Sequence, residues 1–98
     1  MTGRRSRFEI YVDILTEIKK GSKKPTQIMY GANLSWVPLQ GMLGSLTKQG
    51  LIEEIEGLRK DKRTKKRFEL TSKGENVIRY YRKAKNLIEI SSAKEPGL

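Results

Sequence analysis

The sequence predicts one small domain of the mainly α (α+β) class, with the element order helix, helix, helix, strand, strand, helix. Three observations predict this order. Apolar residues recur at helical spacing in the N-terminal half, two strand-like segments then flank a strongly basic run, and an amphipathic segment follows them. A chain of 98 residues can bury one modest core but not two, so we expect a single domain.

The first helix has clear start and stop signals. Residues 1–5 are expected to form a short basic arm. Ser6 and Glu9 then make an S-x-x-E capping box, which satisfies two backbone N–H groups at the helix start. Gly21 is a good stop signal after Lys20. The apolar residues between these signals repeat at helical spacing and predict the buried face: Tyr11, Ile14, Leu15 and Ile18.

Two further helices follow, joined by a short connection. Pro25 suits the first turn of a helix that runs to Gly31. Residues 32–34 (A-N-L) read as a tight connection, and Ser35 as the N-cap of a third helix ending at Gly50. Such a pair would form a helix-turn-helix, whose second helix enters the major groove of DNA.

The third helix has one apolar face and one bare face. Leu39, Leu43 and Leu46 share the side that we expect to be buried, with Trp36 near its edge. The opposite side carries almost no residue that reads bases, except Gln40 at its boundary and Lys48 near its end. The members of this bare side are Val37, Pro38, Gly41, Gly44, Ser45 and Lys48.

This bare side predicts close approach to DNA with weak sequence specificity. The alternative is that Gly41 and Gly44 pack against another helix, for instance across a dimer. Trp36 has two readings as well, an aromatic residue at the edge of the core or a base contact.

A β-hairpin should come next. Leu51 and Ile52 begin an extended segment in which Gly57 could form a bulge, and the turn should lie near residues 61–64. The returning strand alternates as a half-buried strand does, with Lys66, Phe68 and Leu70 on one side. Three helices followed by a hairpin is the order of a winged helix, in which the hairpin is the wing.

The tip of this hairpin is strongly cationic. The run from Arg59 to Arg67 reads RKDKRTKKR, with seven basic residues in nine and one acid, Asp61. Each phosphate that such a surface neutralises releases condensed counterions, so the run predicts contact with a nucleic-acid backbone. A solvated loop or a nuclear-localisation signal would look similar.

The last helix should begin with a second capping box, Ser72 and Glu75, and run to about Ser91, before a tail over residues 92–98. Its apolar face is wide, which indicates two partners, the domain core and a second copy of the chain. The alternative is a helix packed wholly within the monomer. The residues that fit the a and d positions of a short coiled-coil seam, and so a homodimer interface, are Val77, Tyr80, Ala84 and Leu87.

Composition excludes most catalytic and metal chemistry. The chain has neither cysteine nor histidine, which removes thiolate sites, the commonest metal ligand and the commonest general base. We therefore expect no enzyme, no catalytic residues, no metal, no cofactor and no small-molecule ligand. The net charge of +10 favours a polyanionic partner, although a ribosomal or membrane-surface protein could share it. No segment is apolar enough to cross a bilayer, so we expect a cytoplasmic, nucleoid-associated protein.

Three parts of the chain match a known family. They are I-M-Y-G-A-N-L-S at residues 28–35, the leucines and isoleucine at 43, 46, 51 and 52, and L-T-S-K-G-E at residues 70–75. On these residues the chain resembles, over residues 6–90, the archaeal winged-helix chromatin proteins of the "ten-a" type. It implies a DNA-binding protein that dimerises through its C-terminal helix, in an antiparallel coiled coil. The final helix here is shorter than in that family, and the hairpin tip is longer and more basic.

These observations predict a nucleoid-associated protein or a low-specificity transcription regulator that binds double-stranded DNA. The alternative is a winged helix used as an RNA-binding or protein-protein interaction module of the transcription or translation machinery. The residues expected to contact DNA are Ser35, Trp36, Gln40, Lys48, Arg59, Lys60, Lys62, Arg63, Lys65, Lys66 and Arg67. Candidates for further contact with the DNA backbone are Arg4, Arg5, Lys23 and Lys24.

Overall fold

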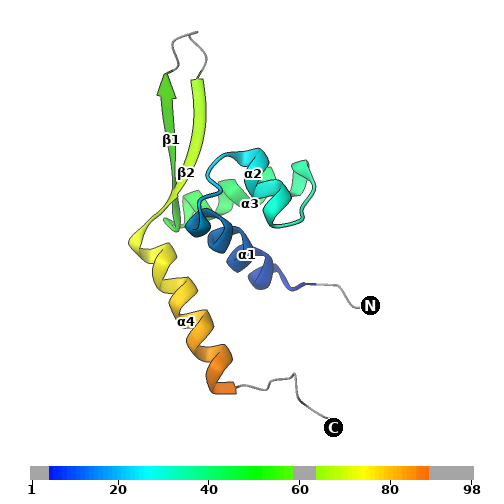
Figure 1. Cartoon of the computed structure of the whole chain (residues 1–98), viewed down its shortest axis with the longest axis vertical. Helices are drawn as coiled ribbons and strands as arrows, with labels where there is room; N and C mark the ends of the chain where they lie inside the picture. Colours follow the sequence, from blue (N-terminus) through cyan, green and yellow to red (C-terminus); the bar gives the residue numbers. More distant parts are fainter. Residues whose placement is uncertain (1–4, 59–63, 89–98) are drawn as a thin grey trace.

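A computed structural model describes residues 5–58 and 64–88 of the chain. The predicted order of elements and the mainly α, winged-helix class are confirmed (Figure 1). The elements are α1 (Arg7–Lys20), α2 (Pro25–Gly31), α3 (Trp36–Lys48), β1 (Ile52–Leu58), β2 (Thr64–Leu70) and α4 (Ser72–Ile88).

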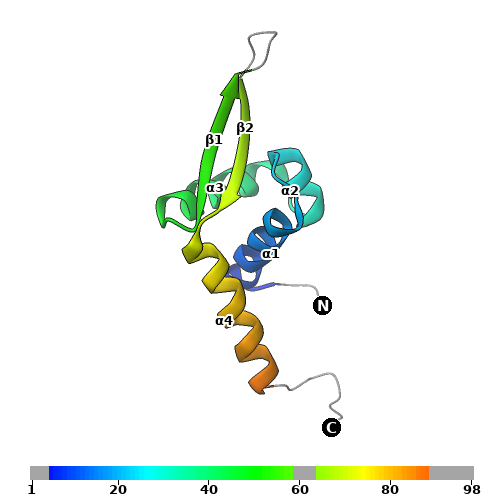
Figure 2. The same ribbon diagram turned by 60° about the vertical axis from the view of Figure 1, so that its left-hand side comes forward.

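The three N-terminal helices form the body of the domain, and two arms leave it. The hairpin β1–β2 and the helix α4 extend from α1, α2 and α3 in opposite directions along the longest axis (Figures 1 and 2). A single residue, Thr71, separates β2 from α4. The base of the hairpin therefore lies against the helical body, while the far halves of both arms project from it.

The core lies where the three helices meet the base of the hairpin and the start of α4. Every element except the far ends of the arms contributes to it. The buried members are Ile14, Leu15, Ile18, Ile28, Ala32, Leu39, Leu43, Leu46, Leu51, Ile52, Phe68 and Ile78. The apolar faces predicted for the first and third helices are thus the ones that pack, because burying them removes apolar surface from water.

The ends of α1 follow the sequence signals. The Glu9 N–H donates to the Ser6 hydroxyl oxygen at 3.0 Å, and the Ser6 N–H donates to the Glu9 carboxylate at 2.8 Å, so the predicted capping box is confirmed. Gly21 closes the helix with a φ of 119°, a left-handed conformation that favours glycine.

The turn between α2 and α3 depends on an asparagine. Asn33 has a φ of 56°, in the left-handed region that asparagine tolerates better than most residues. The Leu34 N–H then donates to the Met29 carbonyl at 3.0 Å, which closes the end of α2. The tight A-N-L connection predicted from the sequence therefore places α3 at a fixed angle to α2. α3 itself ends at Lys48, two residues before the predicted end at Gly50.

The hairpin is regular, and one detail predicted for it is wrong. The antiparallel register runs unbroken from Ile52 opposite Leu70 to Leu58 opposite Thr64. Gly57 stands opposite Lys65 within this ladder, so it forms no bulge. Both strands have seven residues, and no extra residue has to be accommodated. The turn predicted near residues 61–64 lies outside the described residues except for Thr64, which begins β2.

The start of α4 also differs from the sequence prediction. The cap is Thr71, one residue earlier than expected, because its hydroxyl oxygen accepts the Gly74 N–H at 3.0 Å. The carboxylate of Glu75 is instead paired with Lys19 at 3.2 Å. The prediction of a capping box formed by Ser72 and Glu75 is therefore wrong. The same hydroxyl of Thr71 lies 2.7 Å from the Gly50 carbonyl oxygen, which ties the cap to the end of the α3–β1 connection.

α4 packs on the body through an unexpected residue. Ile78, which is not among the four residues predicted for the seam, is only 2% exposed, while Val77 and Tyr81 are half-buried. The buried side of the helix is therefore rotated toward Gly74 and Ile78.

Candidate nucleic-acid interface

The exposed side of α3 carries mostly small or uncharged residues, with Lys48 as its one basic residue. Leu39, Leu43 and Leu46 turn inward as predicted. The opposite side leaves Val37, Gly41, Gly44 and Lys48 exposed, and Gln40 is exposed beside them. Ser45 is an exception to the predicted bare side. It is half-buried because it lies at the border toward α1, where the Tyr11 hydroxyl donates to its oxygen at 3.1 Å.

The two glycines of this face have no packing role inside the described chain. A Cβ built on Gly41 or on Gly44 would meet no atom within 4 Å. A glycine in a helix interior destabilises the helix by about 1 kcal/mol relative to alanine, so these glycines carry a cost that the domain's own packing does not explain. They allow the backbone of α3 to approach an external surface closely. The alternative from the sequence analysis, packing against a helix of a second chain, would also require this close approach of the α3 backbone.

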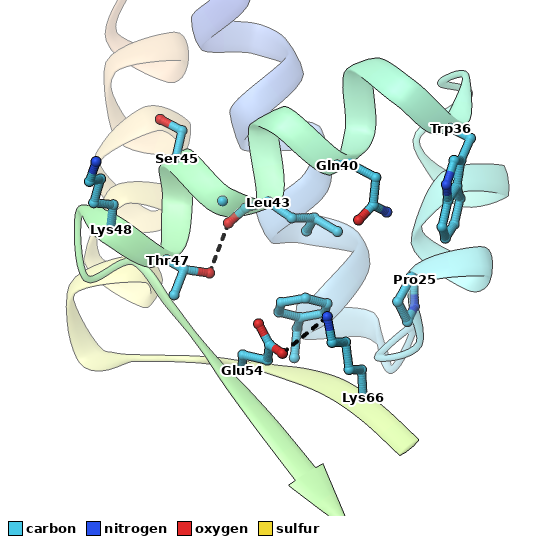
Figure 3. Close-up of a pocket in the computed structure, with 11 residues that line it drawn as sticks. Pro25, Trp36, Gln40, Leu43, Ser45, Thr47, Lys48, Glu54 and Lys66 are labelled. Carbon is cyan, nitrogen blue, oxygen red and sulfur yellow. Dashed lines mark hydrogen bonds and ion pairs between the residues drawn. The ribbon is translucent and has the colours of Figure 1, made fainter. Parts of the chain in front are cut away.

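A groove of about 780 Å³ lies between α3 and the hairpin. Leu43 and Phe68 form its apolar floor, while polar and charged side chains stand around it. Figure 3 shows Gln40 and Leu43 pointing from α3 toward the hairpin, where Glu54 and Lys66 lie. The lining residues are Pro25, Trp36, Gln40, Leu43, Gly44, Ser45, Thr47, Lys48, Glu54, Lys66 and Phe68.

This groove brings together four of the residues that the sequence proposed for DNA contact. Trp36, Gln40 and Lys48 come from α3, and Lys66 comes from β2. Trp36 is 46% exposed at one end of the groove, which agrees with a residue at the edge of the core. The register of the hairpin explains why Lys66 joins them. It lies on the same face of the sheet as the buried Phe68, two residues along the strand.

The groove also contains an acid that the sequence analysis did not single out. Glu54 stands opposite Phe68 in the ladder, and its carboxylate lies 3.4 Å from the Lys66 ammonium. Glu56 is directly opposite Lys66. The described part of the hairpin face toward α3 therefore holds two carboxylates around one lysine. Strand alternation from the apolar Ile52 could have revealed this, because Ile52, Glu54 and Glu56 share one face.

The remaining predicted contacts lie elsewhere. Ser35 is exposed at the N-terminus of α3, without a capping bond from its side chain, and Arg67 is exposed on the face of the hairpin that turns away from α3. Lys65 belongs to β2, opposite Gly57. Five of the predicted residues lie outside the described ranges: Arg4, Arg59, Lys60, Lys62 and Arg63.

Lys23 and Lys24 differ in what they touch. The Lys23 ammonium lies 2.8 Å from the Glu69 carboxylate, and the Lys23 carbonyl accepts the Phe68 N–H at 2.9 Å, so this residue fastens the α1–α2 loop to β2. Lys24 is exposed at the start of α2.

Arg5 is held against the body of the domain. Its guanidinium lies 2.7 Å from the Asp13 carboxylate and donates to the carbonyl oxygens of Ala32 at 2.9 Å and Asn33 at 3.2 Å. It therefore joins the start of α1 to the turn before α3. Contact between Arg5 and DNA stays a prediction, and the guanidinium would have to leave these bonds to make it.

A polar cluster around Ser45 connects α3 to α1. The Arg7 guanidinium donates to the Tyr11 hydroxyl oxygen at 3.2 Å, and this bond holds the pKa of Tyr11 below its ordinary value, with a smaller contribution from Ser45. Gln49 also donates to Ser45, at 3.0 Å. The cluster couples α1 to the C-terminal half of α3.

The described residues contain no helix long and apolar enough to cross a membrane. Within the same ranges, no group of three or more acidic, cysteine or histidine side chains is arranged to hold a metal ion.

The four residues proposed for a dimer interface are not equivalent. Val77 is half-buried against the core of its own chain. Tyr80 is 67% exposed, Leu87 is 79% exposed, and Ala84 is also exposed. These three follow the buried Ile78 in the second half of α4. Ile88, which the seam did not include, is exposed beside them.

Comparison with known proteins agrees with the architecture. A family model described as "Winged helix-turn-helix" matches residues 4–89. The protein MJ0287 of Methanocaldococcus jannaschii is 35% identical over 91 residues, which span 93% of this chain and 81% of that protein. The structure of Sso10a-2, a DNA-binding protein from Sulfolobus solfataricus, matches with a TM-score of 0.62 and 25% identity, over 95% of this chain and 100% of that chain.

A bacterial structure shows the same fold at lower sequence identity. BpsR of Bordetella bronchiseptica, whose DNA binding is regulated by 6-hydroxynicotinic acid, matches with a TM-score of 0.70 over 90% of this chain and 66% of that chain. At 12% identity this likeness concerns the fold alone. The comparisons confirm the resemblance to archaeal winged-helix proteins of the "ten-a" type. The family model and the structure of Sso10a-2 represent winged-helix and DNA-binding proteins and not enzymes, as the sequence predicted.

Proposed function

The chain belongs to the winged helix-turn-helix family, and from this premise we propose that it binds double-stranded DNA. In this proposal α3 lies in the major groove, and basic residues of the hairpin contact phosphates. The observation that carries it is the open face of α3. Gly41 and Gly44 are exposed with nothing of the described chain above them, and a groove that includes Lys48 and Lys66 lies alongside.

Charge supports a polyanionic partner. The net charge is +10, and seven of the basic residues fall between Arg59 and Arg67. Within the described hairpin, Glu54 and Glu56 oppose the charge of Lys66. The basic residues between Arg59 and Arg67 should therefore supply most of the hairpin's phosphate contacts. α3 should supply the close approach to the major groove of the DNA. Sso10a-2, the DNA-binding protein that matches at 25% identity, favours the same class of partner.

We infer a nucleoid-associated protein or a low-specificity transcription regulator of the cytoplasm. Base reading normally uses arginine, lysine, asparagine, glutamine or acidic side chains, and the exposed side of α3 offers only Gln40 and Lys48. A genome-wide occupancy profile separates the two roles. A broad coat indicates a nucleoid protein, and a few sharp peaks indicate a regulator.

The salt dependence of duplex binding tests the proposal. The affinity of the full chain for a duplex should fall steeply with salt, with a slope of about 0.9 per phosphate contact. Replacing the seven basic residues between Arg59 and Arg67 by serine should flatten that slope by several units. An unchanged slope would contradict the role of the hairpin.

A matched pair of variants separates position from total charge. Replacing Lys65, Lys66 and Arg67 by serine removes three charges from β2. Replacing Arg79, Arg82 and Lys83 by serine removes three exposed charges from α4. We expect the first variant to lower the slope clearly more than the second. Equal effects would indicate that net charge, and not the hairpin, determines binding.

Competition with structured RNA at matched salt tests the nature of the polyanion. A-form RNA has a deep, narrow major groove that side chains do not read, so a helix that uses the major groove should prefer duplex DNA. Tighter binding to RNA would overturn the proposal in favour of an RNA-binding module.

We also propose that the chain is a homodimer through α4. Tyr80, Ala84 and Leu87 lie at coiled-coil spacing and are exposed on the projecting half of the helix, with Ile88 beside them. Val77, half-buried on the core, would mark the start of the seam. Exposed apolar side chains in one stripe favour a partner, because single exposed residues are normal but a contiguous patch is not.

Sedimentation of the native chain and of Leu87→Lys tests the dimer. We expect the native chain to sediment as a dimer at tens of micromolar and the variant as a folded monomer. Arg79→Lys, on the far side of α4, is the matched control and should remain dimeric. A native monomer at that concentration would refute the homodimer.

A further inference from the structure

The first two turns of α3 carry a restricted chemistry. In a helix-turn-helix, the N-terminal residues of the second helix contact base edges. The exposed residues here are Trp36, Val37, Pro38, Gln40 and Gly41, and none of them is charged. The first basic residue of the helix is Lys48, in its last turn. Any recognition of bases by this part of α3 therefore depends on the Gln40 amide and on apolar contacts.

Val37 is exposed without a reason inside the described chain. Its side chain is 77% exposed on the outward side of the helix. β-branched residues are not favoured in helices, so neither burial nor helix propensity accounts for valine at this position. An apolar side chain at the start of a recognition helix does have a partner in the major groove, the C5-methyl group of thymine.

Gln40 supplies the complementary polar contact. It lies one turn after Val37, is exposed and lines the groove toward the hairpin (Figure 3). Its amide has both a donor and an acceptor, which match N7 and the N6 amino group of adenine in a bidentate pair. Gly41 and Gly44 beside it leave room for the backbone to approach the bases.

The same turns lack the groups that read G·C pairs. Guanine O6 and N7 are recognised by arginine or lysine, and the N4 amino group of cytosine by a carboxylate. Among the described exposed residues of the first two turns, neither kind is present. Contacts from this part of α3 therefore stabilise binding to A·T pairs more than binding to G·C pairs.

We propose that α3 gives the protein a preference for A·T-rich duplex DNA, read in the major groove by Val37 on thymine methyl groups and by Gln40 on adenine. This inference rests on the proposed function, since it requires α3 to enter the major groove. It names a base composition and not a defined site, and so it agrees with weak sequence specificity.

Four duplexes of equal length test the preference without altering the protein. We expect an alternating A·T duplex to bind roughly fivefold or more tightly than an alternating G·C duplex, the low end of discrimination by one bidentate pair. An A·U duplex, which lacks only the thymine methyl, should lose roughly fourfold per contacted methyl group. An inosine–cytosine duplex has the minor groove of A·T but the major groove of G·C, and it should bind as weakly as G·C.

Two variants assign the contacts to residues. Val37→Ser should bind A·T and A·U duplexes equally, and Gln40→Ala should lose most of the preference for A·T over G·C. Both side chains are exposed, so thermal unfolding should be close to that of the native chain. Val37→Thr keeps one methyl group at the same place and should retain part of the A·T over A·U preference.

The outcomes distinguish this inference from the proposed function. Equal affinity for A·T and G·C duplexes, with a steep salt dependence, would overturn the inference and leave DNA binding in place. Tight binding of inosine–cytosine would also overturn it, because the preference would then come from the minor groove. Loss of binding to every duplex would overturn both.

Discussion

The glycines of α3 and of α4 do opposite things. A Cβ on Gly41 or Gly44 would stand in open space, whereas a Cβ on Gly74 would collide with the carbonyl oxygen of Leu51. Gly74 therefore allows α4 to lie against the start of the hairpin, and its role is internal. The glycines of α3 serve no such contact within the described chain. The same residue type meets a packing constraint in one helix and leaves open space in the other.

Exposed and buried apolar residues repeat this contrast. Ile78 of α4 is buried in the core, while Val37 of α3 is almost fully exposed. α4 itself changes character along its length, since Gly74 and Ile78 pack and Leu87 and Ile88 do not. The start of α4 belongs to the fold, whereas the outward side of α3 and the end of α4 are left exposed.

The largest effect should come from the buried side of α4. Ile78→Ala should lower the free energy of unfolding by about 2–5 kcal/mol, because it leaves a cavity among packed core residues. Ile88→Ala is the matched control and should cost the monomer far less, since Ile88 is exposed. Urea titration measured at concentrations below dimer formation provides the comparison. Equal losses would contradict the division of α4 into a packed half and a free half.

The next effect should come from Gly74. Gly74→Ala should lower the free energy of unfolding by about 1–3 kcal/mol, since the added methyl group forces α4 away from the Leu51 carbonyl. That carbonyl also accepts the Thr71 N–H at 3.2 Å, so it cannot move freely. Thermal unfolding followed by circular dichroism measures the loss. A variant as stable as the native chain would show that the junction tolerates a side chain.

The glycines of α3 should respond in the opposite direction. Gly44→Ala and Gly41→Ala should each raise the free energy of unfolding by about 0.5–1 kcal/mol, because alanine is the better helix former and finds open space. Both substitutions should weaken duplex binding at the same time, because the added methyl group holds α3 away from the major groove of the DNA. Higher stability with unchanged DNA affinity would show that this face does not contact DNA.

The smallest effect should come from the acid in the groove. Glu54→Gln should raise duplex affinity a few-fold at low salt, because it removes a charge that repels phosphates and frees Lys66 from its 3.4 Å ion pair. Its effect on stability should be within about 1 kcal/mol, as for exposed pairs. Glu53→Gln is the matched control, since the register places Glu53 on the other face of the hairpin. If both variants gained equally, the position of Glu54 in the groove would be immaterial.

The sequence located the elements and much of the candidate interface. Trp36, Gln40, Lys48 and Lys66 were identified from residue type and periodicity, and the structure brings them to one groove. Glu54 was not singled out, and Val37 was placed on the bare side of the third helix but not among the expected DNA contacts. The charge of Glu54 matters through its distance from Lys66 across the hairpin, and only the structure gives that distance.

Local physics explains what could be derived from the sequence alone. Capping of α1 by Ser6, the left-handed Gly21, the inward leucines of α3 and the strand alternation around Phe68 all depend on interactions a few residues apart, and they were correct. The tertiary structure decided the rest. Thr71 displaced Ser72 as the cap because its hydroxyl also reaches the Gly50 carbonyl across the fold. Arg5, predicted to belong to a basic arm, instead contacts Asp13 and the turn before α3. Ile78 is the residue through which α4 packs on the core. These outcomes depend on how elements far apart in the chain meet, and periodicity along one segment does not contain that information.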